Sequence, residues 1–108
     1  MAIDRSLSNL LEAIRTECAH ALGDRFDSIV LFGSRARGDA RSDSDIDVLV
    51  ITRGEFDYGD LLQRTSAGLA ELSLKNDVVI SRVFVSREQY DRLHTPFLLN
   101  VHREGVAV

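Results

Sequence analysis

The stretch that decides the fold spans residues 28–51 and reads SIVLFGSRARGDARSDSDIDVLVI. It holds two strongly apolar segments, which are separated by a polar and charged one. The first segment stops abruptly at Gly33-Ser34, and the second opens on Asp45-Ile46-Asp47. Short apolar runs bounded by turn residues are typical of strands. We therefore expect two strands, with the glycine–serine turn and the aspartate pair meeting at one edge of a sheet.

The rest of the chain alternates helical and extended patterns. Apolar residues recur at helical spacing over residues 7–22 and 58–72, and a third strand is expected to open at Asp77 and continue to Val85. A capping-box pattern at 86–89 and Thr95-Pro96 predict two short C-terminal helices, the second ending at Gly105. These elements predict an α/β (α+β) fold, a mixed β-sheet packed with helices.

Length and composition limit the possible functions. The 108 residues are 44% hydrophobic and 28% charged, with 17 acidic against 13 basic side chains. We assign them to a single domain, residues 1–108. The formal net charge of -4 disfavours direct DNA binding. The one cysteine, Cys18, excludes an intramolecular disulfide. No apolar run reaches the roughly 18 residues of a membrane span, and no signal-peptide pattern opens the chain, so we expect a cytoplasmic protein.

The spacing of Asp45 and Asp47 predicts a cation site. Side chains alternate along a strand, so both carboxylates project to one face, with Cα atoms roughly 6.6 Å apart. Two carboxylates held this close repel each other and lose solvation unless cations compensate them. Mg²⁺ takes oxygen ligands and is commonly held by carboxylates together with substrate phosphates. An Asp-x-Asp at a strand start can also be a merely solvated edge.

Gly33 and Ser34 are placed to hold such phosphates. Glycine lets backbone approach an oxyanion closely, and Ser34 offers a hydroxyl and an N–H at the start of a short helix that Gly38 is expected to close. Arg35, Arg37 and Arg41 are candidate charge partners for a polyphosphate. The alternative interpretation is that Gly33-Ser34 form a plain turn and that the charged residues after it form a solvated loop with surface ion pairs.

Together these residues resemble the minimal nucleotidyltransferase branch of the DNA polymerase β-like nucleotidyltransferase superfamily. The resemblance rests on Gly33-Ser34, ten intervening residues and Asp45-Ile46-Asp47, and it extends to the C-terminal stretch 95–106. It implies a palm-like sheet, with Gly33, Ser34, Arg35 and Arg37 binding the nucleoside triphosphate. It also implies that two Mg²⁺ ions are held by Asp45 and Asp47, with Asp77 as a third metal-binding and catalytic carboxylate. Asn76 departs from this pattern, because the family usually has an apolar residue before that carboxylate.

The resemblance further implies a reaction and a partner. ATP would donate AMP to a hydroxyl, expected to be a tyrosine, of a helical HEPN-type toxin ribonuclease, and the chain would act as its antitoxin. Two alternatives remain open. The chain could be a non-catalytic module that masks its partner by contact, or the catalytic subunit of a two-chain enzyme that modifies a small molecule.

Overall fold

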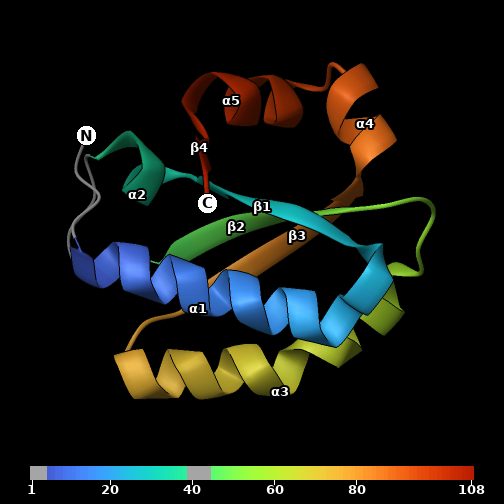
Figure 1. Ribbon diagram of the computed structural model, residues 1–108. Coiled ribbons are helices and arrows are strands. Elements are labelled where there is room, and N and C mark those ends of the chain that lie inside the picture. Colours follow the sequence, from blue (N-terminus) through green and yellow to red (C-terminus); the bar gives the residue numbers. More distant parts are fainter. Residues whose placement is uncertain (1–4, 39–44) are drawn as a thin grey trace.

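A four-stranded mixed sheet forms the middle of three layers in the computed structural model, which describes residues 5–38 and 45–108 (Figure 1). The strand order is β3-β2-β1-β4, where β2 runs antiparallel to β1 and parallel to β3. Helices α1 and α3 cover one face of the sheet, and α4 and α5 cover the other. The elements are α1 (Arg5–Leu22), η1 (Gly23–Arg25), β1 (Phe26–Phe32), α2 (Ser34–Arg37), β2 (Ile46–Thr52), α3 (Tyr58–Asn76), β3 (Ile80–Ser86), α4 (Arg87–Arg92), α5 (Pro96–Glu104) and β4 (Val106–Ala107). The expectation of a mixed sheet packed with helices is confirmed.

The core lies mainly between the sheet and the pair α1 and α3. Alternation along β2 sends Ile46, Val48 and Val50 into this layer, where all three are fully buried. The helix predicted over residues 7–22 supplies the facing stripe, which includes Cys18. Burial raises the pKa of the Cys18 thiol to about 11, so this cysteine is an unreactive packing residue.

The opposite face of the sheet is only partly covered. Leu49 and Ile51 of β2 pack under Leu98 and Val101 of α5. The predicted start of α5, with Thr95 as the N-cap and Pro96 as the first helical residue, is confirmed. Because side chains alternate along β2, Asp47 lies on this same face of the sheet. The helices bury the C-terminal part of β2 and leave its N-terminal start uncovered. The start of β2 is therefore left accessible on the α5 side.

The edge strand β3 is fastened to α3 by a half-buried arginine. Arg82 Nε donates to Thr65 Oγ1 at 2.8 Å, and its Nη2 donates to the carbonyl of Leu62 at 2.8 Å. Hydrogen bonds from a charged donor are stronger than neutral ones. They hold the first half of α3 against β3.

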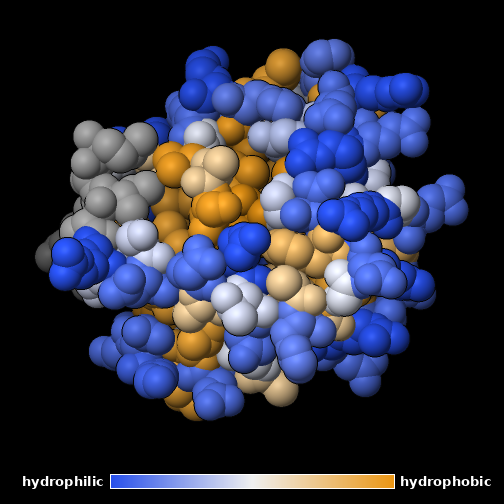
Figure 2. All heavy atoms as spheres, in the orientation of Figure 1, coloured by the Kyte–Doolittle hydropathy of each residue, from blue (hydrophilic) through white to orange (hydrophobic). Residues whose placement is uncertain are grey.

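Apolar side chains reach the surface at the β4 edge of the sheet. Figure 2 shows apolar atoms gathered between α1 and α5, where β4 forms the short edge of the sheet. Among the described residues, no helix is both long and apolar enough to cross a membrane.

Candidate active site

The glycine–serine turn and the aspartate pair meet where β1 ends and β2 begins. Antiparallel pairing sets Phe32 opposite Asp47, so Gly33 follows directly beside that carboxylate. Gly33 has φ 78° and ψ -162°, a conformation open essentially only to glycine. A Cβ at this position would lie 2.6 Å from Asp47 Oδ2. Both the backbone and the contact with Asp47 therefore require glycine.

Asp45 and Asp47 lie close enough for their charges to repel each other. The pKa of Asp47 is raised, first because burial removes water from its carboxylate and second because of the charge on Asp45. A folded chain that keeps two such carboxylates together carries an electrostatic cost that a cation would relieve. Carboxylate oxygens are the ligands that Mg²⁺ prefers, so the donors present fit a divalent cation.

The turn after Gly33 forms the one-turn helix α2. The Gly33 carbonyl accepts from the N–H groups of Ala36 and Arg37 at 3.1 and 3.2 Å, and Gly38 ends the helix at φ 77°, as expected. Ser34 is the first helical residue and is half-buried. The four predicted nucleotide-binding residues, Gly33, Ser34, Arg35 and Arg37, thus lie in one continuous turn.

The arginines of this turn differ in their surroundings. Arg37 Nη1 lies 3.4 Å from Glu104 Oε2 of α5, so a phosphate at Arg37 would compete with that carboxylate. Arg35 is half-buried. Arg41 lies outside the described residues.

Asp77 does not open the third strand, and this prediction is wrong. β3 begins at Ile80, and Asp77 ends α3 in the left-handed conformation with φ 51°. Its N–H donates to the Leu74 carbonyl, and the Val78 N–H donates to that of Ser73. This is the Schellman arrangement, in which a residue of positive φ satisfies the last carbonyls of a helix. The extended pattern of residues 78–80 hid this cap in the sequence.

The role of Asp77 as a third metal-binding and catalytic carboxylate stays a prediction. Within the described residues, no group of three histidine, cysteine or acidic side chains is placed to hold a metal ion. Asp77 and Asp45 instead line a common hollow. The residue that β3 sets beside Asp47 in register is Ser81, which is exposed. The sequence does not single out Ser81, because only the strand register shows which residue of β3 neighbours Asp47.

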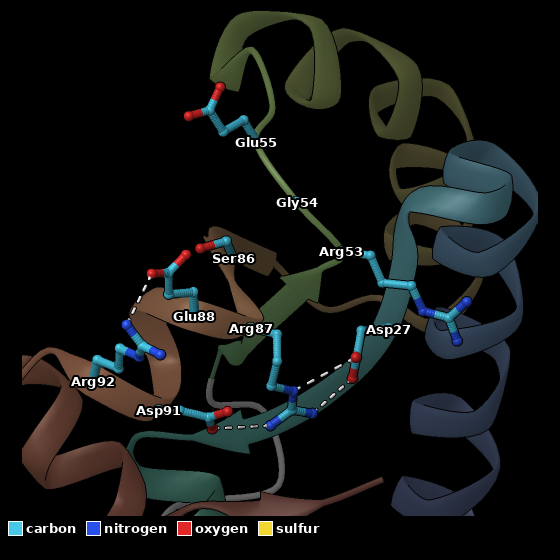
Figure 3. Close-up of a pocket in the computed structure, with 9 residues that line it drawn as sticks. All are labelled: Asp27, Arg53, Gly54, Glu55, Ser86, Arg87, Glu88, Asp91 and Arg92. Atoms are coloured by element: carbon cyan, nitrogen blue, oxygen red, sulfur yellow. Dashed lines mark hydrogen bonds and ion pairs between the residues drawn. The ribbon is translucent and has the colours of Figure 1, made fainter.

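A second hollow lies at the opposite end of the sheet, beyond the C-terminal ends of β2 and β3 (Figure 3). Its charged side chains are largely paired with one another. Arg87 Nη2 lies 2.6 Å from Asp27 Oδ1, and this hydrogen bond holds the pKa of Asp27 below its ordinary range. Arg87 also contacts Asp91, and Arg92 contacts Glu88. The Arg87–Asp27 pair fastens α4 to β1, and the other two pairs lie within α4, so these contacts give the hollow a structural role.

The fold and the placement of this site define a nucleotide-transferring class of protein. The family model of the nucleotidyltransferase domain matches residues 11–98. The chain belongs to the nucleotidyltransferase domain family, and the predicted kinship with minimal nucleotidyltransferases is confirmed.

Two curated relatives come from Methanocaldococcus jannaschii, and both are named as candidate protein adenylyltransferases. MJ0141 is 30% identical over 99 residues, which covers 92% of this chain and 95% of the relative. MJ0604 is 40% identical over 83 residues, which covers 75% of this chain and 76% of the relative.

Solved structures share the fold. A candidate minimal nucleotidyltransferase is 26% identical with a TM-score of 0.65, over 95% of this chain and 93% of that one. A candidate nucleotidyltransferase from Sulfolobus solfataricus has a TM-score of 0.61 at 20% identity, over 93% of this chain and 79% of that one. A toxin–antitoxin structure with AMP-PNP has a TM-score of 0.61 at 20% identity, over 90% of this chain and 70% of that one. At 20% identity, the likeness concerns the fold.

Gly33→Ala tests the contact between the turn and Asp47. We expect the free energy of unfolding to fall by about 1–3 kcal/mol, because alanine is strained at this φ and ψ and its Cβ meets the carboxylate. Gly54→Ala is the control, since Gly54 also has a positive φ, 73°, but open space around it. Urea denaturation measures both variants. An equal loss in both would show that the Asp47 contact is unimportant.

Asp47→Asn tests the electrostatic cost of the pair. Because the pKa of Asp47 is raised, the folded state holds this proton more tightly than the unfolded one, and stability falls as the pH rises through the raised pKa. At neutral pH in EDTA, we therefore expect the variant to melt at a higher temperature than the wild type. The difference should shrink as the pH falls below the ordinary aspartate range.

The same melting curves are then recorded with Mg²⁺. A cation that binds only the folded state raises its melting temperature, so the wild type should gain more than Asp47→Asn. Equal melting temperatures in EDTA at neutral pH would contradict the inferred repulsion.

Asp77→Asn tests whether Asp77 only caps α3 or also takes part in the reaction. Asparagine also tolerates the left-handed conformation, and removing a negative charge from a helix C-terminus is favourable by about 0.3–1 kcal/mol. We expect unchanged or slightly higher stability in denaturant. Loss of nucleotidyl transfer at that stability would give Asp77 a chemical role, whereas full activity would leave it as a cap alone.

Proposed function

We propose that this chain transfers AMP from ATP, with Mg²⁺, to a tyrosine hydroxyl of a HEPN-type toxin ribonuclease and thereby acts as an antitoxin. The observation that carries the proposal is the contact of Gly33 with the Asp47 carboxylate, with Asp45 beside it. A metal-assisted phosphoryl transfer needs a turn that phosphate can approach closely. It also needs carboxylates that bind cations at the same sheet edge.

Each residue of the site has a task in this reaction. Gly33 lets the triphosphate approach the backbone, and Ser34 and Arg35 bind phosphate oxygens at the start of α2. Asp45 and Asp47 hold the divalent cations. When bound, Mg²⁺ supplies positive charge that stabilises the entering and leaving oxygens. Asp77 receives the proton of the acceptor hydroxyl.

Three observations favour a protein as the acceptor. MJ0141 and MJ0604 are both named as candidate protein adenylyltransferases. Several structures of the same fold are toxin–antitoxin complexes. The start of β2 is accessible on the α5 side and carries acidic side chains, and such an edge suits a basic ribonuclease electrostatically.

Mass spectrometry of the HEPN-type partner tests the proposal. After incubation with the wild-type chain, ATP and Mg²⁺, we expect the partner to gain mass in steps of one AMP, and tandem spectra should place it on a tyrosine. EDTA should abolish the gain. An unmodified partner that is nevertheless neutralised would overturn enzymatic transfer in favour of masking by contact.

Substitutions at the pair sharpen this test. Asp45→Asn and Asp47→Asn should reduce transfer by at least about 100-fold, because metal-assisted stabilisation of the transition state is lost. Both should still bind the partner. Asp24→Asn is the charge-matched control, since Asp24 is exposed in η1 at the other end of the sheet, and it should retain full activity. A readout with an aminoglycoside-like hydroxyl compound covers the small-molecule alternative.

A further inference from the structure

A small hollow of about 170 Å³ lies between the glycine–serine turn and α5. It is on the face of the sheet that carries Asp47, because Phe32, which lines the hollow, pairs directly with Asp47 across β1 and β2. The described residues that line it include Phe32, Gly33, Arg37, Phe97, Asn100 and Glu104. The hollow therefore adjoins both the candidate cation site and the turn proposed to bind the triphosphate.

Two phenylalanines form one wall of the hollow. The rings of Phe32 and Phe97 meet edge to face, with their centroids 5.2 Å apart. Phe97 is nevertheless 39% exposed, so part of its apolar surface remains uncovered. An exposed aromatic ring beside a phosphate-binding turn offers a stacking surface for a nucleobase.

Asn100 supplies a polar group of fixed orientation on the α5 side of the hollow. Arg103 Nη2 donates a hydrogen bond to Asn100 Oδ1 at 2.6 Å, and the two residues lie one helical turn apart on α5. This bond holds the amide oxygen toward Arg103 and opposes a half-turn rotation of the amide. The oxygen keeps a second lone pair, and the amide nitrogen carries two N–H donors. Asn100 thus presents an acceptor and a donor in a defined order.

The size and charge of the hollow fit one part of a nucleotide. Its volume is smaller than the roughly 300–1,000 Å³ of pockets that enclose a whole small-molecule ligand. Arg37 Nη1 lies 3.4 Å from Glu104 Oε2, so the carboxylate on the rim is compensated by a guanidinium. A neutral ring can therefore enter without meeting an unpaired charge, while the phosphates stay at Gly33 and Ser34.

We propose that this hollow is the nucleobase subsite, and that Asn100, oriented by Arg103, selects adenine over guanine. This assignment rests on the proposed function. The adenine ring packs on Phe97, its N6 amino group donates to Asn100 Oδ1, and its N7 accepts from the Asn100 amide N–H. This is the pairing that asparagine makes with adenine in nucleic-acid recognition.

Guanine fits the same hollow poorly because of one atom. It carries an oxygen where adenine carries the N6 amino group, so two acceptors would face each other at Asn100 Oδ1. Rotation of the amide would relieve this repulsion, but the hydrogen bond from Arg103 opposes that rotation. Sites that bind a ligand by hydrogen bonds discriminate strongly against analogues that leave those groups unpaired. Arg103 is therefore a positioning residue for the base.

Calorimetric titration of the full chain measures this selectivity. The probes are nonhydrolysable analogues of ATP and GTP and inorganic triphosphate, each with Mg²⁺. We expect the wild type to bind the ATP analogue at least about tenfold more tightly than the GTP analogue, because guanine loses the bidentate pair. Inorganic triphosphate reports on the glycine–serine turn alone, because it carries no base.

Asn100→Ala and Arg103→Ala separate the contact from its orientation. Both residues are exposed, so the variants should keep the fold. Asn100→Ala should weaken the ATP analogue severalfold and bring the ratio of the two Kd values close to one. Arg103→Ala should lower the ratio by tightening the GTP analogue, because the amide can then rotate. Neither change should alter the Kd of inorganic triphosphate.

Phe97→Ser tests the aromatic wall. It should weaken both analogues severalfold and leave their ratio unchanged, because stacking does not distinguish one purine from the other. Leu99→Ser is the control for both sets of variants. Leu99 is 48% exposed on α5 and is not among the described residues that line the hollow.

The outcomes distinguish this subsite from the proposed function. Equal binding of the two analogues by the wild type, or a ratio unchanged in both Asn100→Ala and Arg103→Ala, would overturn the subsite even if AMP is transferred to the partner. Selectivity that depends on Asn100 without any transfer would uphold the subsite and overturn the proposed function. Failure of the wild type to bind any of the three probes would overturn both.

Discussion

The close approach of Gly33 to the Asp47 carboxylate is the constraint on which the site depends. It requires a residue without a side chain at the end of β1 and a register that sets Phe32 opposite Asp47. Because a slip by one residue would move Asp47 to the buried face, the core packing of β1 and β2 also fixes the chemistry at their ends. The fold and the site are therefore specified by the same strand pairing.

The aspartate pair shows why such a site costs stability. The raised pKa of Asp47 reflects lost hydration and the nearby charge of Asp45. A chain optimised for stability alone would replace one of them by a neutral side chain. The buried aliphatic residues that alternate with them, among them Ile46 and Val48, anchor the strand start against this repulsion.

The two faces of the sheet have different roles. Helices α1 and α3 cover one face, bury most of its apolar side chains and hold the strands in place. On the other face, α5 covers Leu49 and Ile51 but leaves the start of β2 open. In the proposed nucleotidyl transfer, this open half is where the nucleotide would meet the aspartate pair.

The sequence by itself determined the helices and the three longer strands, except for the start of β3, because apolar periodicity and the glycine–serine stop are local signals. The predicted meeting of Gly33 with Asp47 required the strand register as well. It also determined the caps at Ser86 and Thr95. Only the tertiary structure decided the fate of Asp77, since a left-handed aspartate that ends a helix resembles a strand start until its backbone bonds are known. The register that sets Ser81 beside Asp47, and the hollow between Gly33 and α5, likewise depend on contacts between segments distant in the chain, and such contacts leave no local pattern.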